Sequence, residues 1–223
     1  MSLSIARRFR GPPESGNGGY SCGVLGARMP WPAEVTLRIP PPLDTPLTIE
    51  GTRLMLGEKL VAEAAPAVID LQPPPPVSFE DAVTASRSYP WFSKHPYPSC
   101  FVCGPEHPEG LHIFPGRAGD VAAAPWMPAE EVSAEVMWAA LDCPSWFGWQ
   151  CVHGWNEGPM LLGRLAARID SLPRAGERCV AIGWPLVREG RKIHTGSAVY
   201  GEDGKLKAVG RSTWIVVKPV AVR

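Results

Sequence analysis

The sequence predicts an α+β protein in which one chain contains two similar modules, each with an antiparallel sheet and an apolar helix. Both halves show the same order of a short strand, an apolar helix and a run of strands, which indicates duplication of one fold. Between them, residues 72–77 include consecutive prolines, and a polyproline stretch fits neither a helix nor a central strand. We therefore expect an abbreviated N-terminal module at residues 1–72, a linker with a connecting helix at 73–98 and a C-terminal module at 99–223.

The first module is expected to contain a helix at residues 17–27. This segment is small and uncharged, and Asn17 is a residue type that caps helix N-termini. Glycine lowers helix stability unless a neighbouring element must come close, so we expect the helix to lie against a sheet; a flexible loop is the alternative. Alternating apolar residues and a Gly-Glu turn predict antiparallel strands at residues 33–39, 47–56 and 59–65.

The second half is expected to begin with a connecting helix at residues 78–87, where a serine precedes acids and spaced apolar residues. A short strand is predicted at residues 111–114. Proline and acids in a first turn predict a helix that starts at Pro128 and continues to Asp142. Glycine, proline and an Asp-Gly turn at Asp203 then separate the strands expected at residues 160–170, 178–187, 192–200 and 206–217.

Composition limits the classes of function. Lysine plus arginine and aspartate plus glutamate both number 22, so no basic field indicates a nucleic-acid partner. No apolar run approaches the roughly 18 residues of a membrane span, and the N-terminus lacks the apolar stretch of a signal peptide. We therefore expect a cytoplasmic protein with a small-molecule partner. The six cysteines are scattered through a chain large enough to form a core without disulfides, so free thiols are expected.

Asp142 is the most informative residue, because it is the one charged residue in an aromatic and aliphatic run at residues 136–150. Burial without a partner disfavours an ionised carboxylate. Such an acid either takes part in catalysis or has a structural role. The structural alternatives are that Asp142 caps the turn before Pro144 or pairs with Arg164 or Arg168.

Two short motifs resemble known thioesterases of the hotdog fold. Cys100-Phe-Val-Cys-Gly104, followed by His107-Pro-Glu-Gly-Leu111, resembles their opening segment, with His107 in place of an asparagine. Asn17-Gly18-Gly19 resembles the His-Gly-Gly that opens the central helix in small acyl-CoA thioesterases, with an asparagine in place of the histidine. The resemblance implies hotdog modules, in each of which an antiparallel sheet is wrapped around a central helix.

Three later segments, residues 138–142, 190–200 and 212–216, resemble the second half of tandem, double-hotdog acyl-CoA thioesterases. In those enzymes a helix-borne aspartate serves the active site, and Asp142 stands at the matching position. They pair that aspartate with a hydroxyl and an amide side chain from neighbouring strands. The strand at residues 161–169 has no Ser, Thr or Gln, so the candidates that remain for the hydroxyl are Thr195, Ser197, Ser212 and Thr213.

The resemblance implies an acyl-CoA thioesterase that cleaves a small or medium acyl thioester without a cofactor. Asp142 is expected to be the base that activates water. Backbone N–H groups around Gly18 and Gly19, at a helix N-terminus, are expected to polarise the thioester carbonyl, and Asn17 or Ser15 to position the water. The tandem arrangement already pairs two modules, and a homodimer is a further possibility.

Aromatic residues near Asp142 are candidates for an acyl or aryl slot, although core packing is the alternative. The expected substrate-binding residues are Gly18, Ser15, Trp146, Trp149 and Thr213, with Trp155 as a further candidate. The arginines near the N-terminus are candidates for coenzyme A phosphates, because guanidinium matches phosphate oxygens; these are Arg7, Arg8 and Arg10.

Two other functions remain open. A catalytically silent hotdog protein that binds an acyl-CoA or aromatic ligand would explain the missing polar partners of Asp142. A small zinc-binding module is the other alternative, because thiolates and imidazoles occur together in one short run. Its ligands would be Cys100, Cys103, His107 and His112.

Overall fold

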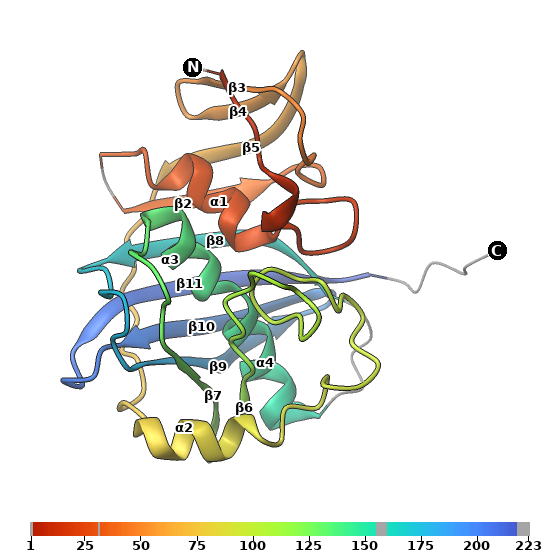
Figure 1. Cartoon of the computed structure of the whole chain (residues 1–223). Coiled ribbons are helices and arrows are strands. Elements are labelled where there is room, and N and C mark those ends of the chain that lie inside the picture. Colours follow the sequence, from red (N-terminus) through yellow and green to blue (C-terminus); the bar gives the residue numbers. More distant parts are fainter. Residues whose placement is uncertain (1, 31, 155–159, 218–223) are drawn as a thin grey trace.

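The computed structural model describes residues 2–30, 32–154 and 160–217. In this part of the chain one eleven-stranded sheet passes through both modules, in the order β1-β3-β4-β5-β2-β8-β11-β10-β9-β7-β6. Every strand pairing is antiparallel. The longer helices of both modules lie on one side of this curved sheet, and α2 lies at its far end (Figure 1).

The N-terminal module contributes one edge of the sheet and one helix. The helix α1 spans Gly18–Gly26, and a short 3₁₀ helix precedes it at Arg7–Phe9. The small residues of α1 allow it to be buried almost along its full length. The strands of this module are β1 (Ser2–Leu3), β2 (Ala33–Leu37), β3 (Leu47–Glu50), β4 (Arg53–Leu56) and β5 (Lys59–Pro66).

The C-terminal module contributes the rest of the sheet and two consecutive helices, α3 (Ala134–Ala140) and α4 (Asp142–His153). The strands curve around α4, which packs against β7, β9 and β10. Pro144 lies in the first turn of α4, where its missing N–H is tolerated and the preceding helix ends. The strands are β6 (Gly116–Ala118), β7 (Val121–Trp126), β8 (Met160–Ile169), β9 (Cys179–Glu189), β10 (Lys192–Tyr200) and β11 (Leu206–Val216).

The two modules join through paired strands and packed helices. Strand β2 pairs with β8, with Val35 opposite Leu165, so the sheet is continuous across the junction. On its concave side α1 packs against α3. A Cβ at Gly26 would lie 2.4 Å from the Trp138 ring, and one at Gly23 would lie 2.8 Å from Trp138 Cβ. The glycines of α1 therefore permit close contact, as predicted, but the closest neighbour is the helix α3 and not the sheet.

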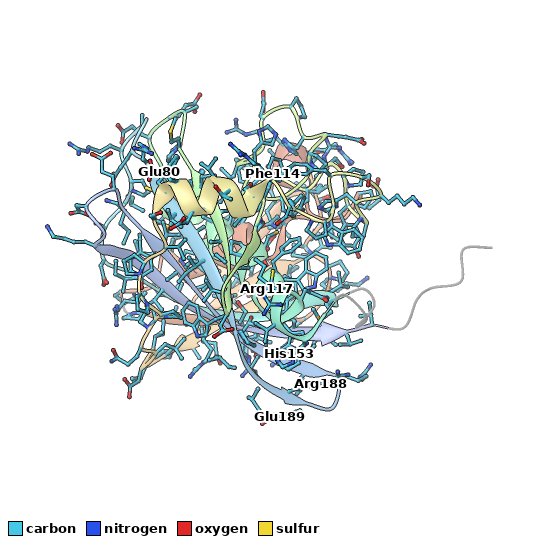
Figure 2. The ribbon with its side chains drawn as sticks, turned by 90° about the horizontal axis from the view of Figure 1, so that it is seen from below. Glu80, Phe114, Arg117, His153, Arg188 and Glu189 are labelled. Atoms are coloured by element: carbon cyan, nitrogen blue, oxygen red, sulfur yellow. The ribbon has the colours of Figure 1, made fainter. Side chains whose placement is uncertain are left out.

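The proline-rich linker crosses the outer face of the C-terminal sheet. Tyr200 donates a hydrogen bond of 2.6 Å to the Pro74 carbonyl, and Ile69 joins a second, smaller core with β9 and β10 residues. The connecting helix α2 (Phe79–Ser86) then packs against β6 and β7. Figure 2 shows α2 with Glu80 on it, and Glu189 at the tip of the β9–β10 hairpin.

Several predicted elements need correction. Residues 111–114 form no strand, and the edge strands β6 and β7 follow them instead. The helix expected from Pro128 begins at Ala134, because Ser133 provides the N-cap by accepting from the Val136 N–H at 3.3 Å. Residues 47–56 form two strands, since Gly51 has a positive φ of 59° and makes a turn. The predicted α1, α2 and the four strands after α4 are confirmed.

None of the described helices has both the length and the apolar character that crossing a membrane requires.

Candidate active site at the junction of the modules

Asp142 lies at the start of α4, where the C-terminal module meets the N-terminus of α1. Its side chain is 2 % exposed. The oxygen Oδ2 accepts a hydrogen bond of 2.8 Å from Asn17 Nδ2 and one of 2.9 Å from the Gly19 N–H. The other oxygen, Oδ1, is buried and has no hydrogen-bond partner within the described residues. One carboxylate oxygen is thus fixed by the N-terminal module, and the other is left without a hydrogen-bond partner among the described residues.

Asn17 performs two functions at once. Its Oδ1 accepts from the Tyr20 N–H at 2.9 Å, so it caps α1, and its Nδ2 donates to Asp142. Nδ2 also lies 3.8 Å from the Cys100 sulfur. Because the cap fixes the orientation of the amide, the donor is held in place for the carboxylate.

The surroundings of Asp142 favour its neutral form. The pKa of Asp142 is raised to about 7, mainly by burial and to a smaller extent by the nearby Cys100, while the hydrogen bonds from Gly19 and Asn17 oppose the change. A carboxyl group with such a pKa is suited to proton transfer near neutral pH.

The N–H group of Gly18 is available at this helix N-terminus. The neighbouring N–H groups are occupied: Asn17 donates to the Phe9 carbonyl, Gly19 to Asp142 and Tyr20 to Asn17 Oδ1. No described residue accepts a hydrogen bond from the Gly18 N–H. This group lies at the positive end of the α1 dipole and therefore suits an oxygen that gains negative charge.

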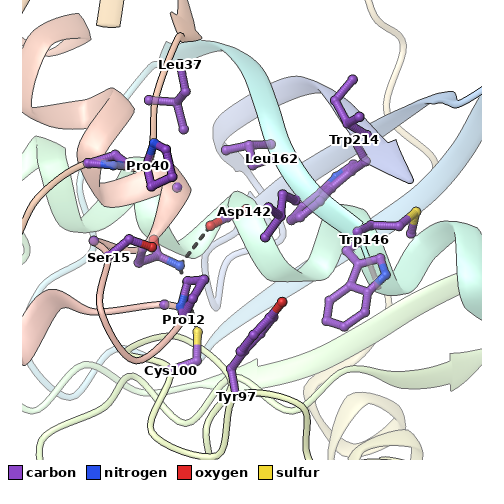
Figure 3. A pocket seen from close by; sticks show the side chains of 18 of the residues that line it. Pro12, Ser15, Leu37, Pro40, Tyr97, Cys100, Asp142, Trp146, Leu162 and Trp214 are labelled. Atoms are coloured by element: carbon purple, nitrogen blue, oxygen red, sulfur yellow. Dashed lines mark hydrogen bonds between the residues drawn. The ribbon is translucent and has the colours of Figure 1, made fainter. Parts of the chain in front are cut away.

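A cavity of about 420 Å³ adjoins Asp142, a size within the usual range for small-ligand sites. Both modules line it (Figure 3). Ser15, Pro12 and Cys100 lie on one side of Asp142, and Trp146 and Trp214 lie on the other. Its further apolar lining includes Leu37, Ile39, Pro40, Pro41, Met160, Leu162 and Ile215.

The structural alternatives for Asp142 do not apply in the structure. Arg164 pairs with Glu34 at 3.1 Å, and Arg168 pairs with Asp170 at 3.0 Å. The carboxylate of Asp142 makes no cap hydrogen bond to its own turn; Ser145 Oγ donates instead to the Asp142 carbonyl at 2.7 Å.

None of the four hydroxyl candidates reaches the carboxylate. Ser212 Oγ bonds Ser145 Oγ at 3.0 Å, and Thr213 Oγ1 bonds His194 Nδ1 at 3.2 Å. Thr195 and Ser197 are buried, and their hydroxyls have no hydrogen-bond partner in the described part of the chain. The polar partner of Asp142 is instead the amide of Asn17, which comes from the other module.

The structure brings together most of the predicted site residues. Asp142, Asn17, Gly18, Ser15 and Trp146 line the cavity, and the Gly19 N–H bonds Asp142. The Gly19 N–H donates to the carboxylate, so the Gly18 N–H is the group at this helix N-terminus that has no acceptor among the described residues.

Other predicted binding residues lie away from the cavity. Trp149 stacks on His153 with ring centroids 4.0 Å apart, and Thr213 faces His194. The neighbouring Trp214 on β11 lines the cavity instead. Trp155 lies outside the described residues.

The N-terminal arginines do not line the cavity. Arg7 pairs with Asp44 at 3.1 Å and Arg8 with Glu109 at 3.9 Å, because acids of neighbouring loops lie beside them. The Arg10 Nε is buried without a hydrogen-bond partner among the described residues.

Residues that the sequence analysis missed complete the site. Met160 and Leu162 alternate along β8, and Trp214 lies opposite Leu162 on β11, so their side chains meet over Asp142. Tyr97 and the thiols Cys103 and Cys143 also line the cavity. Apolar and polar residues do not alternate in Met160-Leu161-Leu162, so no periodic signal in the sequence indicates these two side chains.

All six cysteines are unpaired, as expected. Three of them, Cys100, Cys103 and Cys143, are the group with a suitable arrangement for a metal ion in the described chain. The histidines of the predicted zinc set do not belong to this group. His107 Nε2 bonds the Arg8 carbonyl at 2.6 Å, and His112 Nε2 bonds the His107 carbonyl at 2.8 Å, because the loop folds back on the N-terminal segment.

No protein-family model matches the chain, and no curated protein matches it in sequence. Solved structures are similar to it over nearly its full length. A candidate thioesterase from Novosphingobium aromaticivorans has a TM-score of 0.67 and 10 % identity, covering 97 % of this chain and 95 % of its own. A conserved protein of unknown function with a hot dog fold, from Alicyclobacillus acidocaldarius, has a TM-score of 0.63 and 12 % identity, covering 98 % and 93 %.

The tesB protein of Mycobacterium avium subsp. paratuberculosis has a TM-score of 0.62 and 10 % identity, covering 97 % of this chain and 92 % of its own. Together with the two central helices and the continuous antiparallel sheet, these similarities show that the chain has the hotdog fold, with two modules in one chain.

Proposed function

We propose that the chain is an acyl-CoA thioesterase that hydrolyses a small or medium acyl thioester at the junction of its modules. One observation carries this proposal. The Asp142 side chain lines an apolar cavity, Asn17 and Gly19 hold one of its oxygens, and its other oxygen has no hydrogen-bond partner among the described residues. A buried carboxylate that is held in one orientation and accepts hydrogen bonds through one of its two oxygens has the features of a catalytic group.

The residues divide the chemistry between the modules. The Gly18 N–H would donate to the thioester carbonyl and stabilise the oxyanion that forms as the carbon becomes tetrahedral. The Asp142 carboxylate would accept a proton from the attacking water, and Ser15, at the cavity wall, would help to orient that water. The proton then passes to the leaving thiolate, so the products are a carboxylic acid and a thiol.

The lining of the cavity supports an acyl group as the buried part of the substrate. Leu162 and Met160 provide one wall and the rings of Trp146 and Trp214 another. Such a surface offers apolar contact to a hydrocarbon or aryl chain and few partners for a charged group. The polar groups concentrate near Asp142, where the thioester would lie.

The proposal is tested by thiol release from a panel of short, medium and aromatic acyl-CoAs. We expect saturable turnover that is highest with small or medium acyl groups. Saturable binding of the same compounds with no turnover would contradict the proposal and support the silent ligand-binding protein. The apolar cavity and the lack of a hydroxyl beside Asp142 are the observations that favour that second candidate.

Asn17→Ser is expected to lower kcat by about 10- to 100-fold with little loss of stability. Serine keeps a cap acceptor for the Tyr20 N–H but has no amide to donate to Asp142. Asn17→Ala removes both interactions and should also lower the free energy of unfolding by about 1 kcal/mol. Steady-state kinetics and chemical denaturation of both variants distinguish the role of Asn17 as helix cap from its role as hydrogen-bond donor to Asp142. Equal kcat in wild type and Asn17→Ser would contradict a positioning role.

Met160→Ala is expected to move the preferred acyl chain about two to three carbons longer, because it removes a side chain from the cavity wall. Met137→Ala is the matched control, since Met137 is equally buried but does not line the cavity. The kcat/KM values across a series of straight-chain acyl-CoAs measure the effect. If Met160→Ala and Met137→Ala had the same chain-length profile, the acyl group would not lie against Met160.

A further inference from the structure

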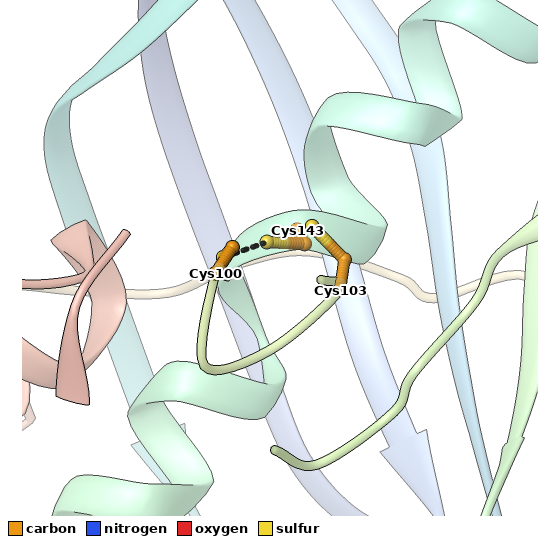
Figure 4. A group of neighbouring side chains, drawn as sticks. All are labelled: Cys100, Cys103 and Cys143. Carbon is orange, nitrogen blue, oxygen red and sulfur yellow. Dashed lines mark hydrogen bonds between the residues drawn. The ribbon is translucent and has the colours of Figure 1, made fainter. Parts of the chain in front are cut away.

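Three buried thiols meet beside the site at the junction of an irregular loop and α4. The sulfurs of Cys100, Cys103 and Cys143 all lie within 4.8 Å of one another, and those of Cys100 and Cys143 are 3.9 Å apart. Figure 4 shows the first two on the loop and the third on the first turn of α4. Zinc–sulfur bonds of about 2.3 Å in a tetrahedral site place sulfurs about 3.8 Å apart. The observed spacing therefore fits a metal ion with little movement.

The loop holds two of these thiols in a tight turn. The Gly104 N–H donates to the Cys100 carbonyl at 2.9 Å, and a Cβ at Gly104 would lie 2.4 Å from the Cys100 nitrogen, so glycine is needed there. The turn therefore brings the Cys100 and Cys103 sulfurs together beside that of Cys143. Cysteine binds a metal ion in its thiolate form.

His95 stands beside the group as a hydrogen-bond donor and not as a ligand. Its Nδ1 accepts from the Tyr97 N–H at 2.8 Å, so the ring proton is on Nε2. Nε2 donates to the Tyr89 hydroxyl at 2.8 Å, and that hydroxyl donates to the Cys103 carbonyl at 2.9 Å. The Cys103 sulfur lies 3.5 Å from Nε2. Hydrogen bonds of this kind hold a ligand-bearing loop in place around a metal site.

The loop needs such an anchor. Residues 87–115 contain neither helix nor strand, and long irregular segments in a compact domain are uncommon without a specific function or constraint. Cys143 directly follows Asp142 in sequence, and the Cys100 sulfur lies 3.8 Å from Asn17 Nδ2. An ion bound here would fix the loop against the same two residues that form the proposed active site.

We propose that Cys100, Cys103 and Cys143 bind one zinc ion, whose fourth coordination position faces the cavity. Thiolates select zinc over the hard divalent cations, and all three cysteines line the cavity, so a water or ligand oxygen has access to the remaining position. His95 supports the site through Cys103. This assignment extends the proposed function without depending on it, because the ion can be measured whether or not the protein hydrolyses a thioester.

The test is metal analysis of the full chain, purified without a histidine tag under reducing conditions. We expect about one zinc per chain, and Co²⁺ added to the metal-free protein should give thiolate-to-cobalt charge-transfer bands of a tetrahedral site. Removal of zinc should lower the Tm by about 5 °C or more. The proposal would be overturned if the purified protein contained no zinc and the reduced protein took up neither Zn²⁺ nor Co²⁺. Bound copper or iron in place of zinc would also overturn it.

Cys143→Ser is expected to reduce zinc content about tenfold. Cys151→Ser is the matched control, because Cys151 is also buried on α4 but lies outside the thiol group. Equal zinc in the two variants would overturn the assignment, and so would a disulfide between Cys100 and Cys143 in the native protein. If Cys143→Ser does not fold, the cobalt spectrum of the wild type tests whether thiolates bind the ion. Asp142→Asn should retain zinc even if it loses hydrolysis, which separates this proposal from the function.

Discussion

Asp142→Asn is expected to lower kcat for acyl-CoA hydrolysis by at least about 100-fold, which corresponds to about 2.7 kcal/mol of transition-state stabilisation. The reason is chemical. An amide cannot accept the proton of the attacking water, although it has almost the same shape as the carboxylate. The effect should appear in kcat more than in KM, because the substrate binds mainly through contacts of its acyl group with the cavity walls and not through the Asp142 carboxylate.

The fold should tolerate this change. The side-chain oxygen of the new asparagine can accept from Asn17 Nδ2 and the Gly19 N–H, as Oδ2 does now. Its amide nitrogen would replace the unpartnered Oδ1, so no buried charge remains. We expect an unchanged or higher free energy of unfolding in urea, with Asp170→Asn as a surface control. A large loss of stability without loss of activity would make Asp142 a structural residue.

Gly19→Ala is expected to have the second large effect, a loss of about 2–3 kcal/mol in the free energy of unfolding. A Cβ at this position would lie 2.5 Å from Asp142 Cβ and 2.6 Å from the Trp138 carbonyl oxygen. Both atoms belong to the other module and cannot rotate away. The modules would have to separate, and the Gly19 N–H would then leave the carboxylate, so activity should fall as well.

Gly18→Ala gives the matched comparison one residue earlier on α1. There a Cβ would lie 2.8 Å from Leu162 Cβ and 2.9 Å from Leu162 Cδ2, and a rotamer change can relieve only the second contact. Because no backbone atom lies among these contacts and the approach is less close than at Gly19, we expect a smaller stability loss than for Gly19→Ala. Urea denaturation of both variants measures the difference. Equal stability of Gly19→Ala and wild type would show that the modules do not need this close approach.

Local sequence patterns predicted much of the fold. The strand pattern at residues 192–200 and the serine cap of α2 use information carried by neighbouring residues, and the structure confirms both. The errors occur where local signals compete. Pro128 and its acids resemble a helix start, but Ser133 satisfies the first turn of α3 instead. The strands β6 and β7 are short and rich in alanine and glycine, so they lack the β-branched pattern that marks a strand.

The site was predicted in part, for a physical reason. Asp142 was identifiable because a lone acid in an aromatic run indicates a buried charge, and Asn17 because it precedes a glycine-rich helix. Their direct contact was not predictable, because it depends on how two modules separated by the linker pack together. Cys143 was missed as a metal-binding candidate for the same reason. It approaches Cys100 and Cys103 only through the tertiary fold.

The measurement that tests the central claim most directly compares binding and turnover at one site. Wild type and Asp142→Asn are titrated with a non-hydrolysable thioether analogue of the best acyl-CoA, and their rates of thiol release are measured with the thioester itself. The account predicts equal affinity within about threefold and a difference of at least about 100-fold in rate. Equal rates in the two proteins, or wild-type binding with no turnover, would contradict it.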